Sequence, residues 1–393
     1  MSDSGPPKTP ADPALRPLSD FKGARDSLSP QERLRQIRRR AAAFRERLLS
    51  QPAVRFYQSC PLVRVPYPTR FGFLNACTVP MPMMHIVNRL FVVQFDPPAG
   101  LRTLLCSPSD VIGGRETPYF KRLARRAALL GERGERLMAP ILGSVEGWLE
   151  TLGLRPEQID YLSYDHLHTQ DLRRWLGSGD RPGFFPRARL LVMRKEWESA
   201  QALLPPQADW YCPRGTEGID PARVELLDGD VMLGESVALL HTPGHTEGNH
   251  SFVVRTPRGL LVTSENGVGA DSYAPLASRI PGLRRYAQDT GVEVILNGNT
   301  QEGGLDQYLS MVQEKEIAGP CPDNPSFFNV ATSSEMDAYW LFPGLRPTYR
   351  FGDLRFGAPG GVDAGAAGGA SKRRAVSADL AAASRINGPG GAA

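Results

Sequence analysis

Five of the six histidines in this 393-residue chain lie in two short stretches, and this clustering constrains the fold more than any other feature. The first stretch, Asp165 to Asp171, contains a His-x-His pair, and the second runs from His241 to His250. Each stretch follows a segment predicted to be a strand. Because imidazole is a common ligand of zinc and similar metals, the pattern favours a fold in which two strand ends meet at a metal site.

The rest of the central sequence predicts a mixture of strands and helices. Residues 52–106 are rich in Val, Phe, Tyr and Leu interrupted by Pro and Gly, which is typical of successive short strands. Two amphipathic helices are expected over residues 119–130 and 141–154. Further strands are expected at residues 159–164, 189–193, 237–240, 251–254, 260–263 and 292–296. This mixture predicts an α/β (α+β) domain with one continuous core.

The two ends differ in composition from the middle and divide the chain into three parts. Residues 1–50 are expected to be a flexible, proline-rich leader followed by a basic amphipathic helix that begins at Ser29-Pro30. The arginines of this helix could meet a partner or an anionic membrane, but a helix packed on its own domain is the commoner case. Residues 51–356 form the expected domain, and the Gly/Ala-rich residues 357–393 form an expected disordered tail.

Charge and cysteine content exclude several classes of protein. The formal net charge of +4 resides at the two ends, and the domain between them is slightly acidic, so we expect no nucleic-acid partner. The five cysteines form no C-x-x-C pair and are expected to be free thiols. The sequence shows no transmembrane segment and no signal peptide, so a cytoplasmic location is expected. The oligomeric state is not predicted.

The residues around the histidines resemble those of the metallo-β-lactamase superfamily, in particular its lactonase-like and glyoxalase II-like hydrolases. Residues 154–160 lead by a strand into His166-x-His168. Leu227-Asp228-Gly229-Asp230 leads by another strand into His241-Thr242-Pro243-Gly244-His245-Thr246. The resemblance covers residues 85–305 or so, and it implies a four-layer αββα sandwich whose metals are held by loops at one edge of the two sheets.

The resemblance implies that His166, His168 and His245 bind a metal, because they match the three histidines of the family's first metal site. Three neutral histidines and a water form the open coordination of catalytic zinc, which lowers the pKa of the water to about 7. The chain is therefore expected to be a zinc-dependent hydrolase of a small-molecule substrate. In that reaction a zinc-bound hydroxide attacks the carbonyl of an ester, lactone or thioester.

The second metal site of the family is altered in this sequence. Gln170 and Asp171 stand where the family has an aspartate and a histidine, Glu265 stands at the bridging aspartate, and Asn299 stands at the last histidine. Gln170 cannot accept a proton, so Asp171 is the candidate catalytic residue that orients or deprotonates the water. Asp171 and Glu265 are also candidate metal ligands. One zinc is expected, with a second, all-oxygen site for a harder ion such as manganese as the alternative.

Other residues have candidate roles around the metal. Asp165 is expected either to orient the imidazole of His166 or to be a solvated carboxylate. Gln170 and Asn299 could contact a second metal through their amide oxygens. The remaining histidines are expected to be packed or hydrogen-bonded rather than to bind metal: His85, His241 and His250.

Two alternatives to hydrolysis stay open. His166, His245 and Glu265 form the two-histidine, one-carboxylate set that holds ferrous iron in oxygenases. Persulfide dioxygenases of the same superfamily have such a mononuclear iron, so an oxygenase with a thiol or persulfide substrate is the second hypothesis. The altered second site favours a third, a non-enzymatic binding protein whose metal site has degenerated.

Overall fold

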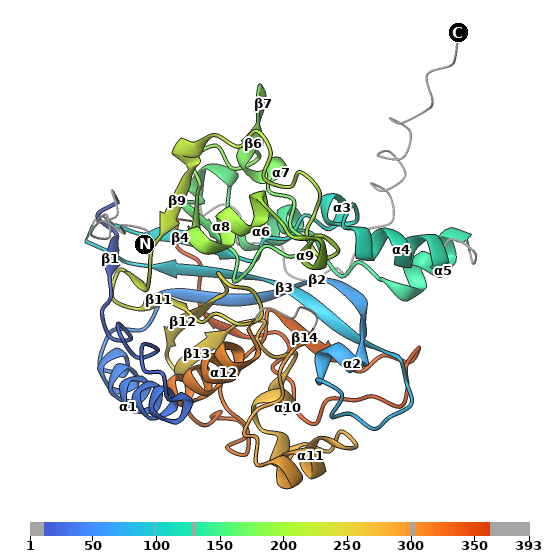
Figure 1. The fold of residues 1–393 in the computed structure, drawn as a ribbon. Helices are drawn as coiled ribbons and strands as arrows, with labels where there is room; N and C mark the ends of the chain where they lie inside the picture. The colour runs from blue at the N-terminus through green and yellow to red at the C-terminus, as the bar shows by residue number, and fades with distance from the viewer. Residues whose placement is uncertain (1–11, 99, 128–130, 299–302, 362–393) are drawn as a thin grey trace.

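Two β-sheets face each other in the computed structural model, and helices cover the outer face of each sheet (Figure 1). The structure describes residues 12–98, 100–127, 131–298 and 303–361. The layers follow in the order helix, sheet, sheet, helix, so the predicted four-layer αββα sandwich is confirmed.

The larger sheet is built around two long antiparallel strands, β2 and β3, which pair along their whole length. The prediction of several short strands over residues 52–106 is wrong here, because a register shift between Pro61 and Val63 lets β2 continue past its prolines. Its later strands, from β4 to β9, pair in parallel. In spatial order the strands are β15 (Arg355–Gly357), β2 (Phe56–Pro68), β3 (Met83–Phe95), β4 (Arg102–Cys106), β5 (Tyr161–Ser163), β8 (Arg189–Met193) and β9 (Val224–Leu227), with β14 (Ser334–Asp337) beside β3.

The smaller sheet is antiparallel throughout. Its strands, in spatial order, are β1 (Leu15–Pro17), β10 (Val231–Leu233), β11 (Val237–His241), β12 (His250–Thr256) and β13 (Gly259–Thr263). β12 and β13 form a tight hairpin in which Thr256 pairs with Gly259. A separate pair, β6 (Gly177–Ser178) and β7 (Arg181–Pro182), lies outside both sheets.

Neighbouring residues of each strand belong to different layers of the core, as the alternation of side chains along a strand requires. In the larger sheet, Val93 packs between the sheets and Val92 packs under the outer helices. In the smaller sheet, Leu239 packs between the sheets and Leu240 packs against the helices of the other side. Both faces of both sheets are therefore buried, which fixes the strand register.

Helices close the two outer faces. α6 and α8 cover the larger sheet, and α1 and α12 pack together over the smaller sheet. The helices are α1 (Pro30–Leu49), α2 (Thr69–Gly72), α3 (Val111–Gly114), α4 (Pro118–Ala127), α5 (Gly131–Met138), α6 (Val145–Leu152), α7 (Arg173–Leu176), α8 (Arg194–Gln201), α9 (Pro205–Ala208), α10 (Ala270–Tyr273), α11 (Leu283–Thr290) and α12 (Gly304–Ala318). Short 3₁₀ turns span Pro156–Gln158, Pro221–Arg223 and Pro275–Ala277.

The N-terminal part is more ordered than its composition predicts. Leu15–Pro17 pairs with β10, so the prediction of a flexible leader is wrong for these residues: Leu15 is buried between the sheets. The helix begins as predicted, since the Ser29 side chain accepts a hydrogen bond from the Glu32 amide. Its apolar face packs on its own domain, as expected of the commoner case. Residues 1–11 lie outside the described part, as does nearly all of the tail expected at 357–393.

Two other expectations can be compared with the structure. The strand expected over residues 292–296 is absent: Val294 and Ile295 are buried, but the segment pairs with no strand in the described chain. Burial alone therefore explains the apolar run. Across the described residues, no helix combines the length and the apolar character that crossing a membrane requires.

Candidate metal centre

Two loops, one from each sheet, bring the histidine stretches together. His166 and His168 follow the end of β5 in the larger sheet, and His245 lies in the loop that joins β11 to β12 in the smaller sheet. The His250 amide, at the start of β12, donates a hydrogen bond of 2.9 Å to the Asp165 carbonyl. This bond ties the two strand ends to each other, so the loops that follow them meet.

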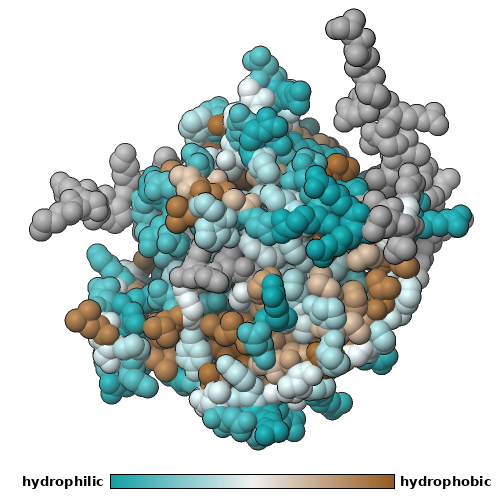
Figure 2. Space-filling view, turned by 45° about the vertical axis from the view of Figure 1, so that its right-hand side comes forward, coloured by the Kyte–Doolittle hydropathy of each residue, from teal (hydrophilic) through white to brown (hydrophobic). Residues whose placement is uncertain are grey.

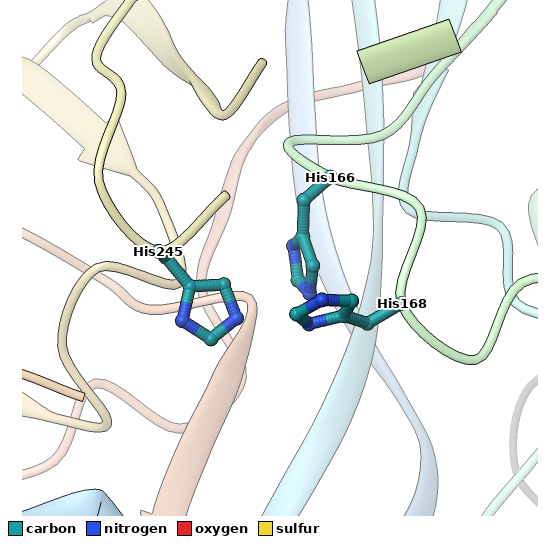
Figure 3. A group of neighbouring side chains, drawn as sticks. All are labelled: His166, His168 and His245. Atoms are coloured by element: carbon teal, nitrogen blue, oxygen red, sulfur yellow. The ribbon is translucent and has the colours of Figure 1, made fainter. Parts of the chain in front are cut away.

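The imidazole rings of His166, His168 and His245 point toward one another (Figure 3). Ring centroids lie 4.6 to 5.0 Å apart, and one potential ligand atom of each ring lies within 4.8 Å of the others. The rings meet at interplanar angles of 70° to 90°, so none of them is stacked face to face on another. We call these three side chains the three-histidine group.

The loop that carries His245 needs glycine at two positions because helices press against it. A Cβ on Gly244 would lie 2.2 Å from the Gln307 Cα of α12, and the φ of Gly244 is +143°. A Cβ on Gly248 would lie 2.2 Å from the Glu196 amide nitrogen of α8. The glycines of the T-P-G-H-T-E-G run therefore let two helices fix the loop from both sides.

The protonation states of His168 and His245 suit metal binding. Burial and the positive charge of His166 hold the pKa of His168 and of His245 well below the ordinary value, so both rings are neutral at pH 7. His168 is buried, and within the described chain neither of its ring nitrogens has a hydrogen-bond partner. Two unpartnered nitrogens in a buried ring are costly unless another group binds them. A metal ion fits this position, because neutral imidazole nitrogens are zinc ligands.

Asp165 holds the ring of His166. The carboxylate is buried, and its Oδ1 lies 3.1 Å from both the backbone amide and Nδ1 of His166. An Nδ1–H donated to Asp165 leaves Nε2 as the nitrogen that faces the group. Burial opposes protonation of His166, but the charge of Asp165 and the hydrogen bond to it raise the pKa of His166 to about 9. A bound metal would compete with that proton.

Glu265 lies beside the group but its carboxylate is not a member of it. Glu265 is buried, and its Oε2 accepts a hydrogen bond of 2.7 Å from the Ser334 amide and lies 2.7 Å from the Ser333 hydroxyl oxygen. The same hydroxyl is hydrogen-bonded to Asp165. One hydroxyl has one proton to donate, so one of the two carboxyls must be protonated. Burial, together with the charge of Asp165, raises the pKa of Glu265 to about 8, which makes Glu265 the protonated partner.

The other predicted residues lie outside the three-histidine group. Asp171 is paired with Arg173, whose Nε and guanidinium nitrogen lie 2.9 and 2.6 Å from its two carboxylate oxygens. Its catalytic role and its role as a ligand stay predictions. Gln170 is buried, and its side-chain oxygen has no hydrogen-bond partner within the described chain. Asn299 lies outside the described residues.

Glu196 of α8, which the sequence analysis missed, connects the two histidine loops. It is fully buried, and its Oε1 accepts from the Leu167 amide at 2.7 Å and from the Tyr211 hydroxyl at 3.0 Å. Its Oε2 accepts from the Thr246 hydroxyl at 2.6 Å. Leu167 stands between the first two histidines and Thr246 follows the third. No sequence signal identifies Glu196, because an acidic residue in the first turn of a helix is ordinarily solvated.

The remaining histidines are packed or hydrogen-bonded, as predicted. His85 is buried between Tyr339 and Phe342, with ring centroids 4.6 and 4.7 Å away. His241 is within 3.0 Å of the Glu247 carbonyl, and His250 is within 3.1 Å of the Ser163 hydroxyl. These contacts account for His85, His241 and His250 without a metal.

Comparison with known proteins gives partial matches. No family model matches the chain. The N-acyl homoserine lactonase AttM of Azorhizobium caulinodans is 28% identical over 185 residues, which cover 40% of this chain and 65% of that protein. An N-acyl homoserine lactonase of a Bacillus species is 32% identical over 111 residues, covering 28% of this chain and 38% of that protein.

Among solved structures, that of a probable metal-dependent hydrolase from Staphylococcus aureus superposes with a TM-score of 0.49 and 9% identity, covering 79% of this chain and 99% of that one. The crystal structure of a quorum-quenching N-acyl homoserine lactone lactonase superposes with a TM-score of 0.40 and 14% identity, covering 62% and 90%. The chain thus spans between 38% and 65% of the length of the curated relatives it matches.

Proposed function

Because this chain belongs to the metallo-β-lactamase superfamily, we propose that it is a metal-dependent hydrolase that opens a lactone or a related ester. The three-histidine group carries the proposal. It brings three imidazoles together at the edge of the two sheets, and in His168 it contains a buried ring whose nitrogens have no other partner in the described chain.

His166, His168 and His245 would hold the metal, and zinc is the ion that this all-imidazole donor set suits best. When bound, zinc supplies a Lewis acid for the substrate carbonyl and lowers the pKa of water to about 7. The chain's own residues then have positioning tasks. Asp165 orients His166 through Nδ1, and Glu196 holds the two loops at a constant separation.

The geometry bears most on Asp171, which the sequence analysis made the candidate residue that orients or deprotonates the water. Both of its carboxylate oxygens are engaged by Arg173. We propose that Asp171 acts on the reaction only if the Arg173 contact opens when substrate binds. If the contact stays closed, its task is to fix the loop that follows His168.

The lactone is chosen over other carbonyl substrates because the curated relatives are named as N-acyl homoserine lactonases. A lactone carbonyl needs the same two aids as any ester carbonyl, a polarising ion and an activated water. A thioester would react by the same chemistry and belongs in the same screen. One metal per chain is proposed, because the ligand positions of the family's second site hold Gln170, Asp171, Glu265 and Asn299 here.

The test is ring opening measured directly. The full chain, loaded with zinc, is mixed with N-hexanoyl homoserine lactone and with simple γ- and δ-lactones, and acid release is followed by pH-stat titration. His168→Ala is the diagnostic variant, and His241→Gln is the matched control, since His241 lies in the neighbouring stretch but not in the group. We expect turnover by the wild type and His241→Gln and at least a hundredfold loss in His168→Ala. No turnover of any lactone, ester or thioester by the wild type would contradict the proposal.

A further inference from the structure

A groove with a volume of about 660 Å³ lies next to the three-histidine group, and the two share a wall at Trp210. Trp210 lines the groove, and its ring centroid is 6.4 Å from that of His168. α2 and α4 form other parts of the wall; both lie on the right-hand side of Figure 1, the side that comes forward in Figure 2. The groove and the metal centre are therefore separated by a single indole ring.

The inner surface of the groove is aromatic. Trp210 stacks on Tyr119 with ring centroids 4.4 Å apart, and it meets the edge of Phe71 at 6.0 Å. Val79 and Leu123 add aliphatic surface. Such a lining favours a substrate with an apolar body, since moving CH₂ groups from water to an apolar surface is favourable.

Two hydroxyl groups at the groove have no hydrogen-bond partner within the described chain. Thr69 and Tyr119 both line the groove, and their hydroxyl oxygens are buried and unpaired. Thr69 is only 4% exposed, so solvent does not replace the missing partner. Unpaired buried hydroxyls are unfavourable.

The groove also carries more positive than negative charge. Arg70, Arg122 and Arg126 line it, together with a single acidic residue, Asp209. Asp209 is taken by Arg122 in a two-pronged ion pair with both distances at 2.5 Å. Arg70 lies over the Phe71 ring at 4.6 Å. No acidic side chain of the described chain is paired with Arg70 or Arg126, so the groove offers two unneutralised guanidinium groups. Figure 2 shows hydrophilic surface directly beside apolar surface on this face.

We propose that this groove binds the far end of the substrate and that the preferred substrate carries an anionic group, a carboxylate, at that end of an apolar chain. The aromatic lining takes the chain, and Arg70 and Arg126 take the carboxylate. The inference rests on the proposed hydrolase function and deepens it. It separates this chain from a hydrolase of simple neutral lactones, which would leave both guanidinium groups without a partner.

The test compares two 4-nitrophenyl esters of equal chain length. One is the hexanoate, which ends in a methyl group, and the other is the mono-ester of adipate, which ends in a carboxylate. In each reaction water adds to the acyl carbon, the ester C–O bond breaks, and nitrophenolate leaves. We expect the adipate ester to have a KM about fivefold below that of the hexanoate, and this preference should shrink as salt is added. Equal KM values, or a preference for the hexanoate, would overturn the proposal.

Variants of residues that line the groove test whether the lower KM for the adipate ester arises there. Arg126→Gln and Arg70→Gln should each remove most of the preference through KM, with kcat unchanged. Arg125→Gln is the matched control, because Arg125 is exposed on the same helix and does not line the groove. Leu123→Trp should fill the groove and raise KM for both long esters but not for 4-nitrophenyl acetate, which is too short to reach it. An Arg126→Gln variant with the full preference would refute the assignment.

A binding measurement separates this proposal from the proposed function. The mono-anilide of adipic acid and the anilide of hexanoic acid are titrated into the metal-free chain by calorimetry, so that no turnover is needed. Tighter binding of the acidic anilide, abolished by Arg126→Gln, would support the groove even if no ester is hydrolysed. Equal binding of the two anilides alongside ester hydrolysis would refute the groove and leave the hydrolase intact.

Discussion

Removing the Glu196 carboxylate should loosen the metal centre without touching a metal ligand. Glu196 joins the His166–His168 loop to the His245 loop through Leu167 and Thr246. In Glu196→Ala, the Leu167 amide and the Thr246 and Tyr211 hydroxyls lose the buried Glu196 carboxylate as their acceptor. No side chain of α8 then ties the two loops together at this point. The metal itself must therefore order the histidines.

The size of the effect follows from these contacts. A buried donor left unsatisfied costs about 1–3 kcal/mol, so the Leu167 amide and the Thr246 hydroxyl alone predict that Glu196→Ala is destabilised by about 2–6 kcal/mol. Residues that orient metal ligands typically change metal affinity by about 10–100-fold when replaced. In Glu196→Gln the amide oxygen can still accept from Leu167, and the Thr246 hydroxyl can turn to accept from the new amide. This variant should therefore lose less than about 1.5 kcal/mol and less than about tenfold in affinity.

The assay is zinc competition against a chromogenic chelator, combined with urea unfolding of the metal-free chain. Glu198→Gln is the matched control, because Glu198 lies on the same helix with its side chain 65% exposed. The ordering expected for zinc affinity is wild type equal to Glu198→Gln, then Glu196→Gln, then Glu196→Ala. If Glu196→Ala folds and binds zinc as tightly as wild type, the loops do not depend on Glu196 and the reasoning is wrong.

Three further predictions address other parts of the chain. Burial lowers the pKa of His85 to about 4, so unfolding takes up a proton below pH 6.5 or so. Between pH 7 and pH 4 the urea-derived free energy of unfolding should fall by about 2–3 kcal/mol more in wild type than in His85→Phe; parallel pH profiles would contradict this. Phe44→Ala should cost about 3–5 kcal/mol in the same assay, because Phe44 is fully buried between helix and sheet, while exposed Arg39→Ala should stay within about 0.5 kcal/mol. Asp171→Asn should keep its zinc, since Arg173 holds Asp171 outside the three-histidine group, and metal loss on elemental analysis would refute that placement.

The family resemblance predicted the four layers, and the strand and helix periodicities, which are local signals, predicted several of the elements within them. Residues 189–193 are a strand with the predicted bounds, and the turn after Thr256 joins two strands as the alternating pattern requires. The run at residues 292–296 misled the analysis, because apolar residues buried in a coil look the same as a short strand. Leu15–Pro17 was missed because a three-residue edge strand has too little pattern to detect among prolines.

The site was predictable only where the motif was dense. Five histidines in two stretches indicated the three-histidine group, since its members occupy the motif positions themselves. Glu196 and Ser333 could not be found in this way. They lie far along the chain from the residues they contact, and only the packing of α8 and the segment before β14 against the loops brings them there. The ion pair that holds Asp171 is likewise invisible in a sequence, where a carboxylate beside a metal motif is most simply interpreted as a ligand.

The most direct test of the metal centre is elemental mass spectrometry of the full chain, purified without chelator, beside His168→Ala prepared in the same way. The account predicts one metal ion per wild-type chain, zinc, and none in the variant. Iron in place of zinc would favour the oxygenase interpretation of the same residues. A wild-type chain that binds no metal, even after zinc, manganese or ferrous iron is added, would contradict the account, because the three-histidine group would then not be a metal site.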